Sequence, residues 1–304
     1  MINYYEKIKQ ELLNNEISKL AKRNSINNSD LTTYYNVGKM LSETGKSYGE
    51  NIIGKYSVKL IQELGKKYNT TTLKRMRQFY LLIEKGARFG HQLSWSHYRE
   101  LIPIKNINEV NYYINICEKE LLTRDELRNR IKSKEYERLG EETKNKLITN
   151  EKLKLPDLVP NPIMIPSCDY VDINSISEKY LQETIMLNIS SFLKELGNGF
   201  SFIGNEYKIK MGNNYNYIDL LLYNVKFKCY VVVELKVTVL KKEHIGQIQV
   251  YMNYIDKNVK ELTDNKTIGI IICSKNNQFI IEYSSDERIF AREFKLESKV
   301  LNLN

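Results

Sequence analysis

Apolar residues recur at helical spacing through roughly the first 135 residues, and no alternating pattern typical of strands interrupts them. The pattern predicts helices at residues 5–21, 31–44, 51–64, 108–118 and 123–132. The last of these begins Thr-Arg-Asp-Glu, which resembles a capping box. Trp95, Tyr98 and Leu101 have the spacing of core residues. We therefore expect an all-helical N-terminal half.

After residue 170 the pattern changes to a mixture of helices and strands. Ser177–Leu196 is amphipathic along its whole length and predicts one long helix closed by glycines. Strands are expected at residues 200–211, twice within 216–239, at 267–273 and near 288–296, and helices at 241–256 and near 277–283. This order predicts an α/β domain with a central hairpin.

Four of the five prolines lie between these halves, at Pro156, Pro160, Pro162 and Pro166. Each fixes φ and lacks an N–H donor, so neither a helix nor a central strand is expected there. We predict a helical domain over residues 1–140, an extended Pro-rich linker over 141–170 and an α/β domain over 171–304.

The hairpin of the second domain, NYIDLLLYNVKFKCYVVVELKVTV, carries three charges within otherwise apolar strands. If the strands are related by a turn centred on Lys226–Phe227, Asp219 faces Glu234 with about 5 Å between their Cα atoms. Because strand side chains alternate, Lys236 projects from the same face as Glu234, roughly 6.6 Å farther along. Two carboxylates and an ammonium then converge on one small volume.

Such a cluster is costly where both faces of the strands are apolar, because an unpaired buried charge costs several kcal/mol. Facing carboxylates repel each other unless a cation joins them, and hard oxygen ligands on a rigid sheet suit Mg²⁺, with Mn²⁺ as a substitute. The alternative interpretation is a buried Glu–Lys pair beside an edge aspartate. The shared register of the three charges favours the metal site.

Composition bears on the partner and the compartment. The chain is 42% hydrophobic and 27% charged, which is typical of a soluble globular protein, and its net charge of +9 favours a polyanionic partner. The four cysteines form no CxxC pair, which argues against a zinc knuckle or a disulfide framework. No signal region or membrane-length apolar run occurs. A cytoplasmic protein without a membrane partner is expected.

The predicted helix at 51–64, a glycine-containing turn and a second helix have the outline of a helix-turn-helix, with Thr70–Thr72 able to cap the second helix. In such folds the N-terminal end of the second helix meets base edges. Four polar residues lie near that end here: Lys74, Arg75, Arg77 and Gln78. Residues 65–90 contain seven Lys or Arg and one acid, Glu84. We expect this helix to bind DNA or RNA; the alternative is a solvated face of a basic protein.

Several short strings carry a resemblance to a known family. FLKELG, YIDLLLYN, VVVELKV and GQIQVY, with the Asp-x₁₄-Glu-x-Lys spacing and the Gln-x₃-Tyr helix, resemble the YhcG-type PDDEXK nuclease family. LKRMRQFY and LSWSHYREL are similar to the helical domain that precedes the nuclease domain in that family. The resemblance covers roughly Tyr34 to Leu296. It implies a restriction-endonuclease-like mixed sheet flanked by helices, preceded by an all-α helix-turn-helix or winged-helix-like DNA-binding domain.

The resemblance also implies roles for the residues of the hairpin and the helix after it. Asp219 and Glu234 would be ligands of Mg²⁺, and Lys236 would hold or activate the attacking water and counter charge on the phosphoryl oxygens. Gln247 would support the water or a phosphate. Tyr251, one turn beyond, would contact DNA or pack in the core.

The resemblance further implies an acid on the leading helix, which we assign to Glu183 as a ligand that reaches the metal through a water. Gln182 occupies a neighbouring position where acids are common in the family, so Glu178 and Glu195 stay open as rivals. His244 is interpreted as a surface residue, and His91 and His97, without partners at metal-ligand spacing, as structural or surface residues.

The expected function is a Mg²⁺-dependent nuclease that hydrolyses DNA phosphodiester bonds. The alternative is a catalytically silent DNA-binding protein of the same fold in a defence or mobile-element complex, since a family assigns fold more securely than activity. A purely structural α/β protein is disfavoured by the basic helix and the charged cluster. A homodimer stays an open possibility, because cutting two strands usually takes two sites.

Overall fold

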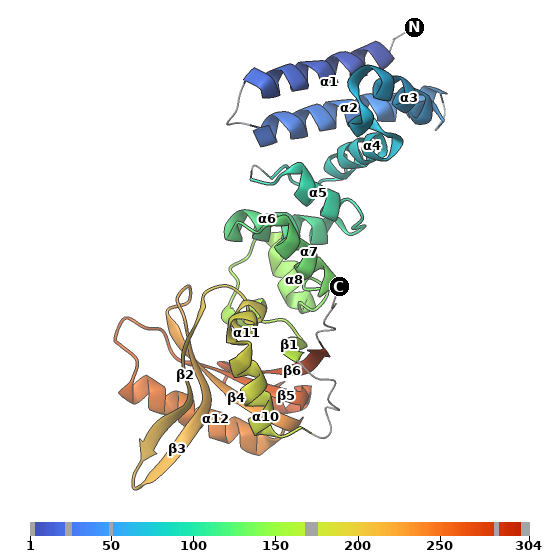
Figure 1. The fold of residues 1–304 in the computed structure, drawn as a ribbon. Coiled ribbons are helices and arrows are strands. Elements are labelled where there is room, and N and C mark those ends of the chain that lie inside the picture. Colours follow the sequence, from blue (N-terminus) through green and yellow to red (C-terminus); the bar gives the residue numbers. More distant parts are fainter. Residues whose placement is uncertain are drawn as a thin grey trace. The chain divides into compact units, whose positions relative to one another are not determined.

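The structure is a computed structural model that describes residues 4–21, 26–48, 51–90, 92–167, 176–282 and 286–298. It divides into two compact units, Met1–Tyr136 and Glu137–Asn304, which Figure 1 shows in blue to green and in green to red. His91 and Cys168 lie outside the described residues. None of the helices in the described ranges has the length and apolar composition needed to cross a membrane.

The described residues of the first unit form helices joined by short links. These are α1 (Tyr4–Ala21), α2 (Ile26–Tyr48), α3 (Ile52–Leu64), the 3₁₀ turn η1 (Lys66–Tyr68), α4 (Thr70–Glu84), α5 (Trp95–Leu101), α6 (Ile107–Glu120) and α7 (Arg124–Lys132). The helices predicted from periodicity are present, and Thr123 and Glu126 form the predicted capping box of α7. The described part of this unit is all-α, as predicted, and contains α3–η1–α4, the outline of the expected helix-turn-helix, without a strand that could form a wing.

Packing against α2 determines which face of α4 is exposed. The apolar residues of α4 are buried at helical spacing: Leu73, Met76, Phe79 and Leu82. Gly38 of α2 allows the close approach, because an added Cβ there would overlap the Met76 carbonyl group. The helix begins after Asn69, whose side chain accepts a hydrogen bond from the backbone N–H of Thr72 at 3.0 Å. The cap therefore lies one residue before the predicted Thr70–Thr72.

The second unit is a six-stranded mixed sheet with helices on both faces, as predicted. Its elements are α8 (Glu141–Thr149), α9 (Leu155–Leu158), β1 (Ile163–Ser167), α10 (Glu178–Leu187), α11 (Ile189–Leu196), β2 (Phe200–Met211), β3 (Asn214–Asn224), β4 (Cys229–Val239), α12 (Lys242–Asn258), β5 (Ile268–Lys275), α13 (Gln278–Glu282) and β6 (Ile289–Ser298). The strand order is β1-β6-β5-β4-β3-β2, antiparallel from β2 to β4 and parallel from β4 to β1.

Alternate residues of the central strands enter two separate cores. Val231, Val233 and Leu235 of β4 pack with α10 and α11 on one face. Val232 of β4 packs with α12 on the other face, where Gly269 lies so close to Met252 that a Cβ would overlap its sulfur. The centre of the sheet is thus covered on both sides, and any charge placed there is removed from bulk water.

The expected Pro-rich linker is wrong, because residues 141–167 form two helices and a strand. Pro156 occupies the first turn of α9, where its missing N–H group is not needed. Pro166 lies in β1, an edge strand that pairs only with β6. Arg138 and Arg292 donate to the carbonyl oxygens of Pro162 and Val159 respectively, which fixes this segment to the second unit.

The single helix predicted over Ser177–Leu196 is also wrong. It consists of α10 and α11, which meet at Asn188 with φ of −124° and ψ of 29°. Leu187 is 81% exposed at this break. The break allows α10 to follow β4 and α11 to pack on β1 and β2.

Candidate active site

The β3–β4 ladder has the register predicted from the sequence. Leu220 pairs with Val233 and Tyr223 with Tyr230. The next position along the same register brings Asp219 opposite Glu234. Oδ2 of Asp219 accepts a hydrogen bond from the backbone N–H of Leu235 at 2.7 Å, so the aspartate side chain is tied to the strand that carries Glu234.

Glu234 is a buried carboxylate with unused hydrogen-bonding capacity. Its side chain is 1% exposed, and Oε2 lies 3.5 Å from Nζ of Lys236. Oε1 is buried and has no hydrogen-bond partner among the described residues. Burial, reinforced by the charge of Asp219 and opposed by Lys236, raises the pKa of Glu234 to about 8. Burial also raises the pKa of Asp219.

Lys236 completes the predicted cluster and extends it to the leading helix. Nζ lies 3.5 Å from Oε2 of Glu234 and 3.5 Å from Oε2 of Glu178 on α10. Burial acts to lower the pKa of Lys236, but the charges of Glu234, Glu178 and Asp219 outweigh it and raise that pKa. The ammonium therefore stays charged at neutral pH and acts as a donor.

Among the leading-helix acids, Glu178 is the one that the structure brings to the cluster. It shares a helix face with Leu181 and Ile185, which are buried against the sheet. Glu183, our first assignment, lies on the exposed side of α10, so its prediction as a ligand is not supported by its position. The sequence could have identified Glu178, because Leu181 and Ile185 follow it by three and seven positions and therefore share its helix face.

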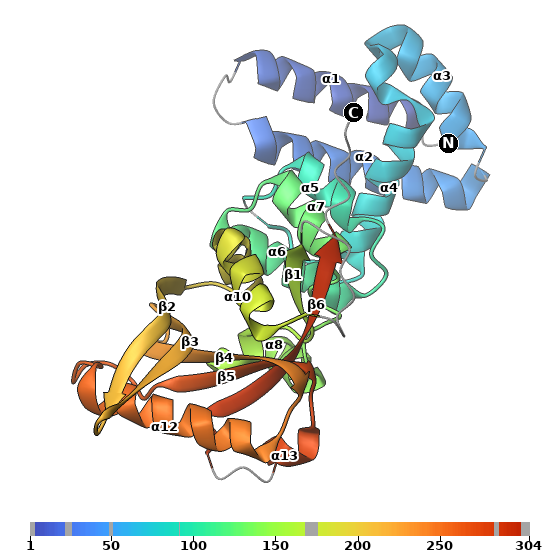
Figure 2. The same ribbon diagram turned by 60° about the horizontal axis from the view of Figure 1, so that its bottom comes forward.

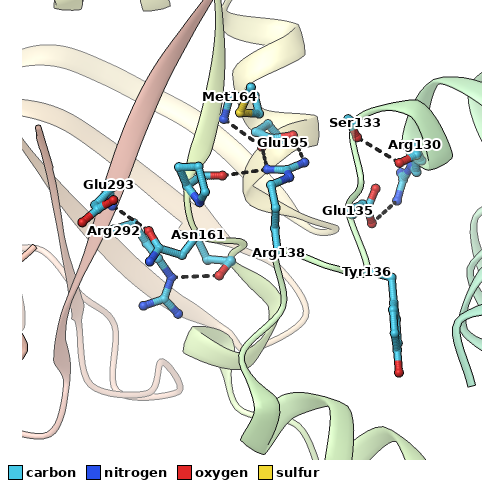
Figure 3. Close-up of polar contacts among 12 residues, drawn as sticks. Arg130, Ser133, Glu135, Tyr136, Arg138, Asn161, Met164, Glu195, Arg292 and Glu293 are labelled. Carbon is cyan, nitrogen blue, oxygen red and sulfur yellow. Dashed lines mark hydrogen bonds and ion pairs between the residues drawn. The ribbon is translucent and has the colours of Figure 1, made fainter. Parts of the chain in front are cut away.

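Glu195 has a structural role instead. Its carboxylate pairs with the guanidinium of Arg138, and Oε1 accepts a hydrogen bond from the backbone N–H of Met164 at 2.9 Å. Figure 3 shows this arrangement, in which Arg138 also donates to Pro162. The figure also shows Arg130 of the first unit, whose guanidinium donates a hydrogen bond to the carboxylate of Glu135. Glu195 is therefore removed from the candidate metal ligands.

Two residues that received no role from the sequence also border Asp219. Nε2 of Gln182, one helical turn after Glu178, donates to the backbone carbonyl oxygen of Asp219 at 3.1 Å. Glu206 is the β2 residue opposite Asp219 in register, between the pairs Asn205–Leu220 and Tyr207–Ile218. Its φ of 46° is unusual for a residue other than glycine. Gln182 could have been identified from the sequence, because it lies four residues, about one helical turn, after Glu178. Nothing in the sequence around Glu206 indicates that it lies near Asp219.

The residues predicted on the helix after β4 have mixed positions. Nε2 of Gln247 donates to Oη of Tyr251 at 3.2 Å. Within the described residues, no hydrogen bond joins Gln247 to the carboxylates of Asp219 and Glu234. Tyr251 is 6% exposed within the α12 core, which favours its packing role over the predicted DNA contact. His244 is buried rather than a surface residue, and its Nδ1 accepts from Lys241 N–H. Burial, together with the charge of Lys236, lowers the pKa of His244.

The nucleic-acid-binding residues predicted for the first unit all lie on α4. Lys74, Arg75 and Gln78 are exposed on the face opposite α2. Arg77 is half-buried, and its Nε has no hydrogen-bond partner among the described residues. The four side chains therefore do not form one face: three are available to a ligand and the fourth is partly packed.

The carboxylates are suited to a divalent cation. Oε1 of Glu234 is a buried oxygen without a donor, and two acids across one ladder stay charged more readily when a cation joins them. The described residues hold no ready group of three His, Cys, Asp or Glu side chains in a metal-binding arrangement. Two carboxylates with several waters are a common donor set for Mg²⁺, so the residues present fit such an ion.

Comparisons with known proteins extend along most of the chain. Residues 164–301 match the family model of the YhcG PDDEXK nuclease domain, and residues 7–138 match that of the DUF1016 N-terminal domain. A protein of Escherichia coli strain K12 named "Putative nuclease YhcG" is 22% identical over 324 residues, which cover 90% of this chain and 85% of that protein.

Two solved structures show a similarity over shorter stretches. A repair endonuclease from Pyrococcus abyssi has a TM-score of 0.30 at 19% identity, covering 43% of this chain and 50% of its own. The EndoMS–dsDNA2 complex has a TM-score of 0.29 at 18% identity, covering 43% of this chain and 49% of its own. The chain thus spans about half the length of these two proteins.

Proposed function

Since the chain belongs to the YhcG-type PDDEXK nuclease family, we propose that it is a divalent-metal-dependent nuclease that hydrolyses DNA phosphodiester bonds. The reaction centre is the cluster of Asp219, Glu234 and Lys236. The observation that carries the proposal is the buried Oε1 of Glu234, which lacks a hydrogen-bond donor beside a second carboxylate. A structural ion pair has no need for an unpartnered oxygen or for a second acid.

Asp219 and Glu234 would hold Mg²⁺, for which Mn²⁺ is a possible substitute, and Glu178 would join them through a water. When bound, the ion lowers the pKa of a water and offsets the charge that develops on the phosphoryl oxygens. The chain positions its two carboxylates rigidly. Leu235 N–H anchors the side chain of Asp219, and Gln182 anchors its backbone carbonyl group. Hydrogen bonds of this kind, made to a metal-binding residue by its neighbours, preserve the orientation of its side chain.

Lys236 would act as a donor rather than as a base. Its raised pKa keeps Nζ protonated, so it can hold the oxygen of the attacking water and donate to a non-bridging phosphoryl oxygen. The attacking water gives up a proton to solvent as its oxygen bonds to phosphorus, the P–O bond to the leaving strand end breaks, and the leaving oxygen takes up a proton from solvent. Gln247 is available to orient a water or phosphate once it leaves Tyr251.

We propose DNA as the partner of the first unit as well, through the exposed Lys74, Arg75 and Gln78 of α4. Two adjacent cations beside an amide donor suit phosphate and base-edge contacts, and the basic balance of the whole chain agrees with this. A cytoplasmic location is part of the proposal. So is a homodimer, which would supply one centre for each strand; sedimentation at several protein concentrations tests it.

The test is cleavage of supercoiled plasmid, branched DNA, single-stranded DNA and RNA with Mg²⁺ or Mn²⁺, with EDTA as a control. Glu234→Gln is expected to lower the rate by more than about 100-fold, because it removes a ligand charge. Glu183→Gln, an exposed glutamate on α10, is the matched control and is expected to cut like the wild type. Metal-independent cleavage, or full cleavage by Glu234→Gln, would refute the proposal. DNA binding without cleavage on every substrate would favour the silent DNA-binding alternative.

A further inference from the structure

The β2–β3 hairpin extends as a long two-stranded arm beyond the residues that pair with β4. β3 pairs with β4 from Leu220 to Asn224, whereas β2 and β3 continue to pair as far as Met211 and Asn214. Figure 2 shows this arm beside α12 at one edge of the sheet. Two-stranded ribbons of this length are marginal by themselves, so the arm needs a packed face.

One face of the arm is packed against the second unit. Ile209 and Ile218 are buried in the α12 core, and Tyr254 of α12 accepts a hydrogen bond through Oη from the backbone N–H of Lys210 at 3.5 Å. These contacts hold the arm in place.

The alternate residues of the arm are exposed and consist of lysines and tyrosines. Lys208 pairs with Tyr217 and Lys210 with Tyr215, so the four side chains share one face. Tyr215 is 53% exposed and Tyr217 is 52% exposed. The acid nearest to these side chains on the same face is Glu206, opposite Asp219, and between Tyr207 and Ile218 the sequence contains none. The exposed face is therefore positively charged and aromatic together.

The lysines and tyrosines are already ordered with respect to one another. Nζ of Lys208 lies 3.9 Å from the centroid of the Tyr215 ring, and Nζ of Lys210 lies 6.0 Å from it. Both distances are within the range of a cation–π contact. An ammonium beside an exposed aromatic ring can bind a phosphate while the free side of a ring stacks on a base.

The position of this face relates it to the reaction centre. Tyr217 is two residues before Asp219 on β3, which is about 7 Å along the strand, and Tyr215 is about 7 Å farther away. A base can stack on the side of the Tyr215 ring that Lys208 leaves free, or on the Tyr217 ring. A strand bound along the arm would lead directly to Asp219.

We propose that Lys208, Lys210, Tyr215 and Tyr217 form a binding surface for an unpaired stretch of DNA next to the scissile phosphate. The proposal rests on the proposed nuclease function, to which it adds the class of substrate: DNA with a single-stranded or unpaired segment. In a duplex the faces of each base are covered by the neighbouring base pairs, so the tyrosine rings can stack only on bases of an unpaired strand. The lysines add sequence-independent phosphate contacts.

The test is binding in EDTA, where no cleavage occurs, measured by fluorescence anisotropy on oligo(dT) of about 20 nucleotides and on a duplex of the same length. Tyr215→Ala/Tyr217→Ala is expected to weaken binding of the single strand by about 10- to 100-fold and of the duplex by less than about threefold. The Tyr→Phe pair keeps the rings and is expected to bind normally.

Lys208→Ala/Lys210→Ala is expected to reduce the salt slope for the single strand by about 1.4, since each phosphate contact contributes about 0.7. Lys257→Ala/Lys266→Ala removes the same charge from exposed positions elsewhere in the second unit and serves as the control. Circular dichroism checks that each variant is folded.

Unchanged binding of the single strand by the tyrosine variant would overturn the proposal, as would an equal loss on duplex and single strand. Capture of a protein through the arm with no effect on DNA would also overturn it. Because binding is measured without metal, its failure is distinct from failure of the nuclease assay, which is scored by cleavage.

Discussion

Replacing Glu234 with glutamine is expected to stabilise the metal-free protein and, at the same time, to lower the rate of cleavage. The side chain is 1% exposed, and the carboxylate has one oxygen without a donor and a second acid opposite. An amide of nearly the same shape carries no charge that must be removed from water. The site is thus one where function and stability of the metal-free fold are opposed.

The magnitude follows from the pKa of Glu234, which is raised from 4.5 to about 8. The unfolded chain loses its proton near pH 4.5, whereas the folded protein keeps it to about pH 8, so the unfolding free energy falls as pH rises through this window. At about 1.36 kcal/mol per pKa unit, raising the pH from about 5 to about 8 removes stability on the order of 3 kcal/mol. This is a large share of the 5–15 kcal/mol typical of a domain.

The assay is urea unfolding in EDTA at pH 5, 6, 7 and 8, followed by far-ultraviolet circular dichroism, since the single tryptophan, Trp95, lies in the first unit. The difference between wild type and Glu234→Gln reports on this carboxylate and its coupling to Asp219, because His244 titrates in both proteins. The difference should be small at pH 5 and reach about 3 kcal/mol in favour of the variant at pH 8. A variant that is no more stable than wild type at pH 8 would refute the reasoning.

Three further predictions concern the neighbours of this carboxylate and the first unit. Lys236→Met should lower the cleavage rate by about 100- to 1,000-fold while DNA binding is kept, as measured by single-turnover kinetics and anisotropy; an unchanged rate would exclude a role in charge stabilisation. Glu178→Gln should lower the rate or the Mg²⁺ affinity by about 10- to 100-fold in a metal titration, and Glu183→Gln should change neither; the reverse order would restore Glu183 as the leading-helix acid. Lys74→Ala/Arg75→Ala should reduce the salt slope of duplex binding by about 2 without changing chemistry on bound DNA, and an unaffected slope would identify this as a solvated face.

The register of the β3–β4 hairpin could be predicted because chemistry and geometry agree there. Charges are tolerated in apolar strands only where they meet, and the spacing of Asp219 and Glu234 about the turn meets this condition. The same local reasoning located β2 at residues 200–211, since its pattern and its glycine boundary are contained in the sequence itself. Neither result depends on distant contacts.

The parts that could not be predicted depend on contacts distant in sequence. Pro166 excludes only a central strand, and its missing donor does not matter in β1, which pairs with β6 at the edge of the sheet. The break at Asn188 is invisible in a periodic pattern that continues through it, and it follows from how two helices cover a twisted sheet. Glu206 lies near Asp219 because β2 pairs with β3 on either side of that position. Glu178 could have been chosen over Glu183 from the sequence, because it lies on the same face of the helix as the apolar residues that pack on the sheet.

The central claim is that the carboxylate pair of the hairpin is the reaction centre of a nuclease. It is tested most directly by single-turnover cleavage of the same DNA with Mg²⁺ by wild type and by Asp219→Asn, which keeps the shape of the side chain and an acceptor for Leu235 N–H. The account predicts EDTA-sensitive cleavage by wild type, a loss of more than about 100-fold in the variant, and equal DNA binding by both. Cleavage by Asp219→Asn at the wild-type rate would contradict it.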